Sequence, residues 1–191
     1  MTIAFHKPYG VITGFTDPHA QQAGPRRPAL ADYLERSGMS PVGRLDLDSE
    51  GLLLLTDEPR VSQALTTPGR HSKTYWVELE RVPDEAALRK FRERVILQNE
   101  KTRPAEIHLI QAPVLGPRLV PVRERKNVPT CWAEVVLWEG KNRQVRRMTA
   151  AIGHPTLRLL RWAVGPITLG DLAAGQSRPL TPSEQKWLSR L

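Results

Sequence analysis

A group of charged residues suited to catalysis stands directly before the leucine run of the chain. Acidic residues alternate at Asp46, Asp48 and Glu50, which we call the acidic cluster, and Arg44 precedes them. A carboxylate that a neighbouring guanidinium keeps ionised can act as a nucleophile. A structural ion pair would leave the same pattern in a sequence. The residue types alone support both interpretations equally.

The same segment partly matches a calcium-binding EF-hand loop, whose ligands come from set positions of a 12-residue loop. The first, third, fifth, sixth and twelfth positions hold Asp46, Asp48, Glu50, Gly51 and Asp57. An EF-hand loop needs a helix on each side, however, whereas a proline and a glycine precede this segment and four leucines fill it. Its last position also carries Asp where the motif requires Glu. The sequence therefore argues against calcium binding.

Other catalytic and metal-binding motifs fail on their spacing. Ser49 stands two residues before a glycine, as in the nucleophile elbow of serine hydrolases, but Leu47 occupies the place where that motif requires glycine. The five histidines show no metal-ligand spacing, and no phosphate-binding loop or dinucleotide fingerprint occurs. Cys131 is the single cysteine, so no internal disulfide can form, and it is expected to pack in a strand. No metal site is predicted.

The charge of the chain favours a polyanionic partner. Lys and Arg number 28 against 20 Asp and Glu, which gives a formal net charge of +8. Residues 140–162 contain no acidic residue, and the cations found there are Lys141, Arg143, Arg146, Arg147, Arg158 and Arg161. One surface is therefore expected to attract phosphate groups. A solvated basic helix face would give the same pattern.

The length of 191 residues suits one domain, with two lobes around a shared cleft, and we expect residues 1–191 to form one such unit. The first residues lack the hydrophobic stretch of a signal peptide. No later run reaches membrane-spanning length. We therefore expect a cytoplasmic protein with no membrane partner.

Hydrophobic periodicity and turn residues predict an irregular succession of strands and helices. Strands are expected over residues 2–6, 11–15, 52–55, 74–79, 106–110, 131–138 and 156–163. Helices are expected over residues 29–37, 61–65, 83–95 and 142–152, and after a capping sequence at residues 181–184. Loops are expected over residues 16–28 and 112–129. This order predicts an α+β fold, with a mixed, largely antiparallel sheet and flanking helices around a central catalytic cleft.

Four segments of the chain resemble the motifs of one enzyme family, in the same order. Residues 43–56, which read GRLDLDSEGLLLLT, resemble the catalytic motif of the RsuA-type pseudouridine synthases. The family's other motifs are matched by residues 5–10 (FHKPYG), 73–77 (KTYWV) and 139–148 (EGKNRQVRRM). Because the resemblance covers nearly all of the chain, it implies the pseudouridine synthase fold.

The resemblance also implies roles for the matching residues. Asp46 corresponds to the nucleophile, which attacks C1′ of the sugar or C6 of the uracil, so that the base detaches, rotates and rejoins through C5. Tyr75 corresponds to the active-site tyrosine that stacks on the uracil, and Arg146 to the basic residue that pairs with the nucleophile. No cofactor is implied. The basic residues expected to contact RNA are Arg44, Lys73, Lys141, Arg143, Arg147 and Arg158.

The same resemblance implies a substrate. We expect no S4 RNA-binding domain before the first motif, and residues 122–126 and 155–159 resemble the branch of the family that modifies a uridine of 23S ribosomal RNA. The expected partner is 23S ribosomal RNA or an assembly intermediate of the large subunit, bound by a monomer. The alternative is an RNA-binding protein with a structural role in ribosome assembly, because the basic segment would bind RNA without any chemistry.

Overall fold

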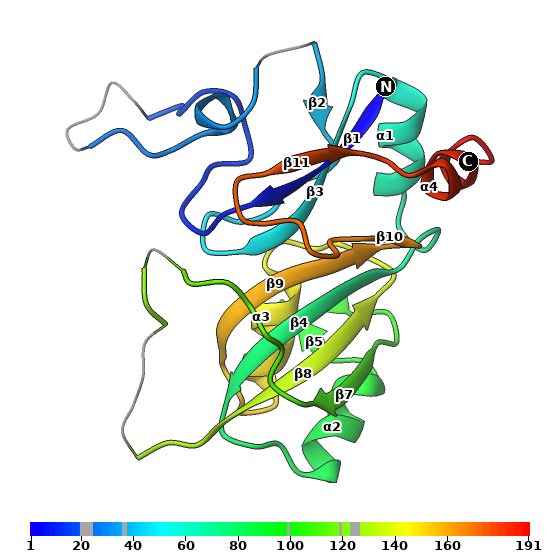
Figure 1. The fold of residues 1–191 in the computed structure, drawn as a ribbon. Coiled ribbons are helices and arrows are strands. Elements are labelled where there is room, and N and C mark those ends of the chain that lie inside the picture. Colours follow the sequence, from blue (N-terminus) through cyan, green and yellow to red (C-terminus); the bar gives the residue numbers. More distant parts are fainter. Residues whose placement is uncertain (20–24, 36–37, 99, 119, 123–126) are drawn as a thin grey trace.

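The computed structural model describes residues 1–19, 25–35, 38–98, 100–118, 120–122 and 127–191. The strands of its main sheet lie side by side in the order β11-β1-β3-β9-β4-β8-β7 (Figure 1). Their bounds are β1 Thr2–Lys7, β3 Glu50–Thr56, β4 Lys73–Glu80, β7 Glu106–Ile110, β8 Thr130–Leu137, β9 Thr156–Val164 and β11 Ser177–Pro179. Two short strands extend this sheet, β2 Ser40–Pro41 beside β3 and β10 Ile167–Thr168 beside β9. A separate ribbon consists of β5 Ile96–Leu97 and β6 Glu100–Lys101.

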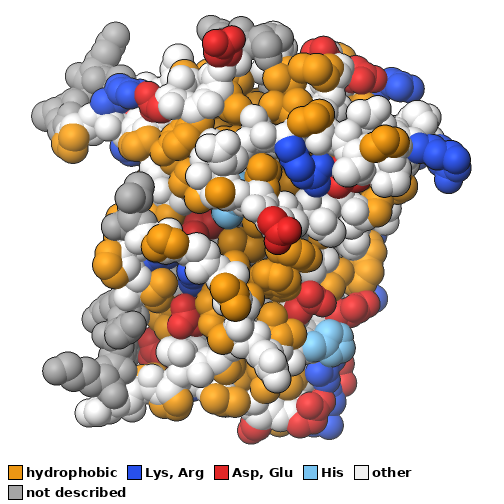
Figure 2. Space-filling view, viewed as in Figure 1, with side chains coloured by type: hydrophobic (Ala, Val, Ile, Leu, Met, Phe, Trp, Pro, Cys, Tyr) orange, Lys and Arg blue, Asp and Glu red, His pale blue; other side chains and the backbone are white. Residues whose placement is uncertain are grey.

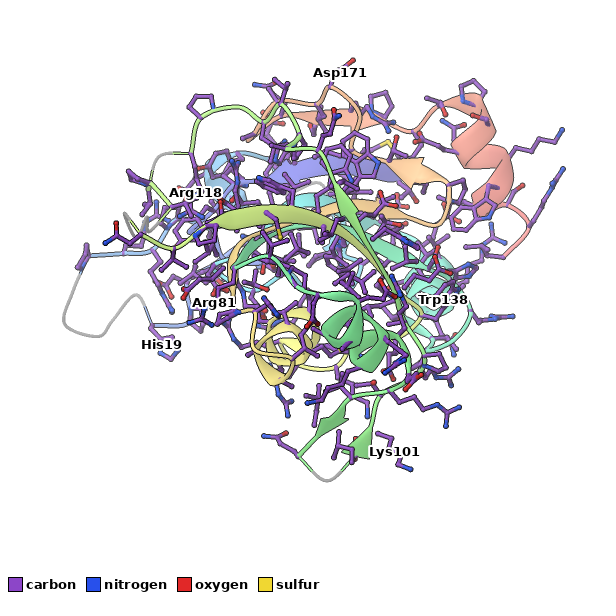
Figure 3. The ribbon with its side chains drawn as sticks, turned by 90° about the horizontal axis from the view of Figure 1, so that it is seen from below. His19, Arg81, Lys101, Arg118, Trp138 and Asp171 are labelled. Atoms are coloured by element: carbon purple, nitrogen blue, oxygen red, sulfur yellow. The ribbon has the colours of Figure 1, made fainter. Side chains whose placement is uncertain are left out.

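The helices pack on this sheet through narrow hydrophobic faces. Their bounds are α1 Pro59–Thr66, α2 Glu85–Arg92, α3 Gln144–Ala151 and α4 Pro182–Leu188. Seen from below, α2 and α3 lie on the same side of the sheet (Figure 3). Leu88 and Phe91 of α2 and Val145 and Met148 of α3 are buried in one hydrophobic cluster with side chains of β4 and β8. Burial of these helix faces stabilises the side of the sheet that carries the expected tyrosine.

The mixed character of the sheet comes from one short contact. The strand pairs are antiparallel except β3 with β9, which is parallel and pairs Glu50 with Leu160 and Gly51 with Arg161. This contact joins β11-β1-β3 to β9-β4-β8-β7. The expected α+β fold with a mixed, largely antiparallel sheet is confirmed.

Strand β3 is buried along its whole length, as its leucine run predicts. Every residue from Glu50 to Thr56 is buried. Leu52 and Leu54 join a cluster that includes side chains of α1 and α4, whereas Leu53 and Leu55 face a second cluster with Phe5. Alternate side chains of a strand point to opposite faces, so an uninterrupted apolar run suits a strand covered on both faces.

Two of the elements predicted near the N-terminus, the strand over residues 11–15 and the helix over residues 29–37, are not formed as predicted. Residues 11–15 form no strand, and Ile12 makes only an isolated bridge to Ala29. The main chain of this segment is bonded to residues 28–30 instead, because Ile12 N donates to the Pro28 oxygen and the Gly14 oxygen accepts from Leu30 N, both at 2.8 Å. The side-chain oxygen Thr13 Oγ1 exchanges hydrogen bonds with the main chain of Leu45. The helix expected over residues 29–37 is a single 3-10 turn at Leu30–Asp32, and residues 36–37 lie outside the described residues.

The remaining expected helices and strands are confirmed, with small shifts of their ends. Of the expected loops 16–28 and 112–129, residues 20–24, 119 and 123–126 lie outside the described residues. The last helix has the capping box that its sequence predicts, because Thr181 Oγ1 accepts from Glu184 N and the Glu184 carboxylate accepts from Thr181 N. The two- and three-residue strands β2, β5, β6, β10 and β11 were not expected, since strands this short show no periodicity.

The face seen in Figure 2 has hydrophobic side chains spread over its middle, while Lys and Arg gather mainly towards its margins. The exposed hydrophobic residues include Leu109, Val114 and Val120. None of the helices in the described part of the chain is long and apolar enough to cross a membrane.

Gly51 permits the close approach of β3 to β9, and this gives a testable prediction. Its φ is +103°, and a Cβ added there would lie 2.7 Å from the main-chain nitrogen of Arg161 and against the Arg161 carbonyl oxygen. We expect Gly51→Ala to lower the free energy of unfolding by roughly 2–5 kcal/mol, from backbone strain and from displacement of β9. Equilibrium urea unfolding measures this loss.

Gly153→Ala is the matched control, because Gly153 has a φ of +88° but an added Cβ would meet nothing within 4 Å. Backbone strain alone then predicts that the free energy of unfolding falls by roughly 1–2 kcal/mol. Equal losses for the two variants would show that the approach of the two strands does not depend on a missing side chain.

Candidate active site

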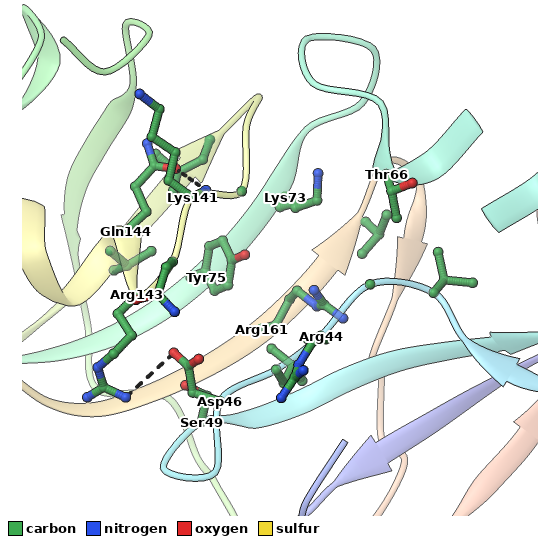
Figure 4. Close-up of a pocket in the computed structure, with 18 of the residues that line it drawn as sticks. Arg44, Asp46, Ser49, Thr66, Lys73, Tyr75, Lys141, Arg143, Gln144 and Arg161 are labelled. Atoms are coloured by element: carbon green, nitrogen blue, oxygen red, sulfur yellow. Dashed lines mark hydrogen bonds and ion pairs between the residues drawn. The ribbon is translucent and has the colours of Figure 1, made fainter. Parts of the chain in front are cut away.

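A cavity of about 570 Å³ opens between the loop that precedes β3, the strands β4 and β9, and the segment that leads into α3 (Figure 4). Its lining includes a carboxylate, an aromatic ring and several cations. The charged residues of this lining are Arg44, Asp46, Lys73, Lys141, Arg143 and Arg161. We call this space the catalytic cavity. Five cations face one carboxylate there, so a polyanion would be attracted to it.

Asp46 reaches the catalytic cavity from the loop that precedes β3. The loop is held by main-chain hydrogen bonds, from Ser49 N to Asp46 O at 3.1 Å and from Gly10 N to Leu47 O at 2.8 Å. The side chain of Asp46 is 32% exposed, and its Oδ2 lies 3.7 Å from Nη1 of Arg143. Asp46 is therefore accessible from the cavity and near a positive charge, without a short hydrogen bond from that guanidinium.

Asp48 receives the strong contacts of both neighbouring arginines. Arg143 donates two hydrogen bonds of 2.8 Å to its two carboxylate oxygens. Arg146 Nε lies 3.3 Å from Asp48 Oδ2, and Arg146 Nη2 donates to the main-chain oxygen of Asp48. Burial disfavours the charge of Asp48, but these arginines outweigh it and lower the pKa of its carboxyl.

The direct contacts of Arg146 in this structure are to Asp48 and not to Asp46, the partner that the resemblance implies. Arg146 is bonded to Asp48 and, through Nη1, to the main-chain oxygen of Thr156. It does not line the catalytic cavity. Burial lowers the pKa of Arg146, and the charge of Asp48 opposes that shift more than the charge of Asp46 does. The arginine that lies next to Asp46 is Arg143 instead.

Arg143 is placed by an unusual backbone conformation. It is the residue that precedes α3, and its φ of 47° and ψ of 35° put it in the left-handed region. Such a conformation is uncommon for a residue with a side chain and tends to occur at functional sites. Its guanidinium lies beside the Asp46 carboxylate (Figure 4) and is hydrogen-bonded to Asp48.

Tyr75 forms the opposite wall of the catalytic cavity with Arg161 beside it. The two residues are register partners in β4 and β9, at a point where the register shifts. Arg161 is buried, and its Nε donates a 2.7 Å hydrogen bond to the Leu52 oxygen. Burial lowers the pKa of Arg161. A charge interaction and a hydrogen bond with the hydroxyl of Tyr75 raise this pKa, but by less. Arg161 thus ties the tyrosine strand to the strand that follows Asp46.

Lys7 is fully buried close to the acidic cluster. Its Nζ donates hydrogen bonds to the main-chain oxygens of Pro8 at 2.9 Å and Val11 at 2.7 Å. Burial lowers the pKa of Lys7 to about 7, although the carboxylates of the acidic cluster oppose the shift. These contacts close the turn after β1, and the hydrogen bond from Gly10 N to the Leu47 oxygen holds this turn beside the loop that carries Asp46.

Arg158 occupies a different environment from the one expected of an RNA-binding residue. Its Nε and Nη2 donate hydrogen bonds of 3.1 and 2.9 Å to the carboxylate of Glu50. The side chain of Arg158 is only 13% exposed, and that of Glu50 only 5%. Arg118 lies 3.6 Å from the same carboxylate. Arg158 therefore neutralises a buried carboxylate, and it does not line the catalytic cavity.

The other basic residues expected to contact RNA divide into two groups. Arg44, Lys73 and Lys141 line the catalytic cavity, as Arg143 does. Burial, with the nearby charge of Arg161, lowers the pKa of Lys73. Arg147 lies on the next part of α3 and does not line the cavity. In the described part of the chain, no group of three or more His, Cys, Asp or Glu side chains is arranged to hold a metal ion.

Arg161 and Lys7 were not among the site residues predicted from the sequence. Arg161 is the last cation of residues 140–162, which contain no acidic residue, and Lys7 lies in the first of the four motifs. The sequence therefore gives only a weak indication that either residue belongs to the site. A buried cation cannot be distinguished from an exposed one by residue type, because its burial depends on strands far away in the chain.

Comparison with known proteins agrees with this geometry. Residues 1–151 match the family model described as RNA pseudouridylate synthase. The chain is 48% identical over 175 residues to the ribosomal large subunit pseudouridine synthase E of Vibrio parahaemolyticus, over 91% of this chain and 71% of that protein. It is 47% identical over 181 residues to the protein of that name from Xanthomonas campestris, over 93% and 94% of the two chains.

A crystal structure of a pseudouridylate synthase superimposes with a TM-score of 0.79 and 28% identity, covering 98% of this chain and 73% of that one. The match of fold thus extends over almost the whole chain. Together with the family match and the placement of Asp46 and Tyr75 on one cavity, these similarities show that the chain belongs to the RNA pseudouridylate synthase family.

Proposed function

We propose that this protein converts a uridine of 23S ribosomal RNA to pseudouridine, with Asp46 as the nucleophile. The observation that carries the proposal is the catalytic cavity itself, in which Asp46 and Tyr75 face one space whose other charged lining residues are cations. A nucleotide offers a uracil ring for the tyrosine and phosphates for the cations.

The proposed reaction needs the residues of this cavity and no cofactor. The Asp46 carboxylate attacks C1′ or C6 of the flipped-out uridine, the bond between C1′ and N1 breaks, and the uracil turns so that C5 bonds to C1′. The bond between Asp46 and the attacked carbon breaks as well, which restores the free carboxylate. The proton on C5 is then removed and N1 gains a proton. The ring of Tyr75 stacks on the uracil and its hydroxyl assists transfer of the C5 proton. Leu54 of β3, with Leu45 and Leu159, lines the cavity with apolar surface and helps to keep the base dry.

The choice of substrate rests on the relatives. Those from Vibrio parahaemolyticus and Xanthomonas campestris are named for the ribosomal large subunit. We extend this to the present chain as 23S ribosomal RNA, free or in an assembly intermediate. We further propose that residues 1–191 act as one catalytic unit, as a monomer in the cytoplasm. Light scattering of the protein with and without RNA tests the monomer.

Replacement of the nucleophile is the first test. Asp46→Asn replaces the carboxylate by an amide, which is not a nucleophile, so pseudouridine formation should fall by about 10⁴-fold or more. Pseudouridine is mapped by chemical adduct formation and primer extension on unmodified 23S ribosomal RNA. The wild-type protein should create one new site.

Asp48→Asn is the matched control, because Asp48 is bonded to Arg143 and Arg146 and does not line the cavity. It should be slower than the wild type but modify the same uridine. A normal rate for Asp46→Asn would place the nucleophile elsewhere. If the wild-type protein binds ribosomal RNA and precursor particles without modifying either, a structural role in ribosome assembly replaces the proposal.

The role of the Tyr75 hydroxyl can be separated from that of its ring. Tyr75→Phe keeps the stacking surface, so the Kd for RNA should change little, while the single-turnover rate should fall by about 10²–10⁴-fold. Tyr75→Leu removes the ring as well and should also weaken binding. Thermal unfolding of each variant checks that the loss of the contact with Arg161 has not disturbed the fold. A full rate for Tyr75→Phe would exclude the hydroxyl from proton transfer.

Salt dependence tests the expected phosphate contacts of α3. Each of Arg143→Ala and Arg147→Ala should weaken RNA binding and reduce the slope of log K against log salt by about 1, because each phosphate contact releases counterions. Arg190→Ala is the control, since Arg190 is exposed and lines no cavity. Fluorescence anisotropy at several salt concentrations gives the slopes. A slope equal to that of the control would place the side chain away from RNA.

A further inference from the structure

A second cavity, with a volume of about 740 Å³, lies next to the catalytic cavity and is not used by the reaction described above. We call it the flanking groove. It lies where β8 ends, close to the ribbon of β5 and β6. The lining residues that matter here are Gly69, Arg94, Lys101, Arg103, Glu106 and Trp138.

The flanking groove shares its wall with the catalytic cavity. Pro68 lines the catalytic cavity and Gly69, the next residue, lines the groove. Likewise, Leu137 lines the catalytic cavity and Trp138, the next residue, lines the groove. Gly69 N donates a 2.6 Å hydrogen bond to the Trp138 oxygen, which joins these two segments into one partition. The two cavities therefore lie on either side of one partition, within a few residues of each other in the chain.

The groove carries unpaired positive charge. Arg94, Lys101 and Arg103 are exposed, and none of them forms an ion pair with a carboxylate of the described residues. Glu106 is the acidic residue of the lining. Three cations against one carboxylate favour an anionic ligand. A guanidinium is also the group best shaped to bind phosphate through two parallel hydrogen bonds.

The backbone holds two of these arginines in particular places. Arg94 has a φ of 99°, a conformation that glycine adopts far more readily. Arg103 lies over Gly69 so closely that a Cβ on Gly69 would stand 3.1 Å from the guanidinium carbon. A non-glycine residue in such a conformation is most often found at a functional site, and the lack of a side chain at Gly69 leaves room for the Arg103 guanidinium beside it.

The groove is also tied to the catalytic cavity by polar contacts. Lys141, which lines the catalytic cavity, donates a 2.7 Å hydrogen bond from Nζ to Glu100 in β6. Glu139 accepts from Arg103 N at 2.8 Å and from Gln144 Nε2 at 2.6 Å. Strand β6 and the main chain of Arg103 are therefore bonded to the segment that leads into α3. Lys101 projects from this ribbon, at the edge of the molecule remote from Asp171 (Figure 3).

We propose that the flanking groove binds the single-stranded RNA next to the target uridine, with phosphates on Arg94, Lys101 and Arg103 and one base stacked on Trp138. Trp138 is half-buried, and among the described residues it forms no pair with another aromatic ring. Aromatic side chains beside basic residues bind single-stranded RNA in this way. The inference rests on the RNA-modifying function proposed above and adds the path of the substrate.

The test compares two variants with the wild type on unmodified 23S ribosomal RNA. In the double variant Arg94→Ala/Arg103→Ala, Kd should rise roughly tenfold and the slope of log K against log salt should fall by about 2. In Trp138→Leu, Kd should rise several-fold with the slope unchanged, because stacking releases no counterions. The loss should appear in Kd and not in the single-turnover rate at saturating RNA.

Lys186→Ala/Arg190→Ala is the matched control, since it removes two exposed cations that line neither cavity. An active wild-type protein whose Kd and slope are the same in the groove double variant and in this control would overturn the groove proposal. A wild-type protein that forms no pseudouridine would overturn the proposed function instead, so the two failures are distinguishable.

Discussion

The arrangement of this site depends on the close contact between β3 and β9. Gly51 and Arg161 are register partners in the parallel pair, and Arg161 Nε donates to the Leu52 oxygen at 2.7 Å. Arg161 also faces Tyr75 across the β9–β4 pairing. One residue thus connects the strand that follows Asp46 with the strand that carries the tyrosine. Because the backbones can approach this closely only at a residue without Cβ, the separation of the two cavity walls is set by a glycine.

The charges around the acidic cluster are divided so that its members have different environments. Glu50 is buried against Arg158, and Asp48 takes the short hydrogen bonds of Arg143. Asp46 has only the 3.7 Å contact with Arg143 and remains accessible from the cavity. A carboxylate that must attack carbon needs an exposed oxygen and a nearby positive charge, and this member of the cluster has both. The two neighbouring acids instead hold the arginines in place.

The long, regular elements could be predicted from the sequence because the order of hydrophobic residues along them directly reflects which side chains are buried. The leucines of β3 and the Leu88 and Phe91 face of α2 are examples. The segment at residues 11–15 has the composition of a strand, yet its main chain bonds to residues 28–30, through Ile12 N to the Pro28 oxygen and Leu30 N to the Gly14 oxygen, so it forms none. Local propensity failed there because contacts with a distant segment satisfied the same backbone groups.

By itself the sequence determined the fold class, the family-like motifs, the position of Asp46 beside a buried strand and an excess of positive charge, since each of these depends on residue type and short-range order. Only the tertiary structure decided which arginine serves which acid. Arg143 binds Asp48 across 95 residues of sequence, and Arg158 binds Glu50 across 108. Several arginines and several carboxylates are interchangeable as residue types, and their pairing follows from the distances that the folded strands and α3 impose.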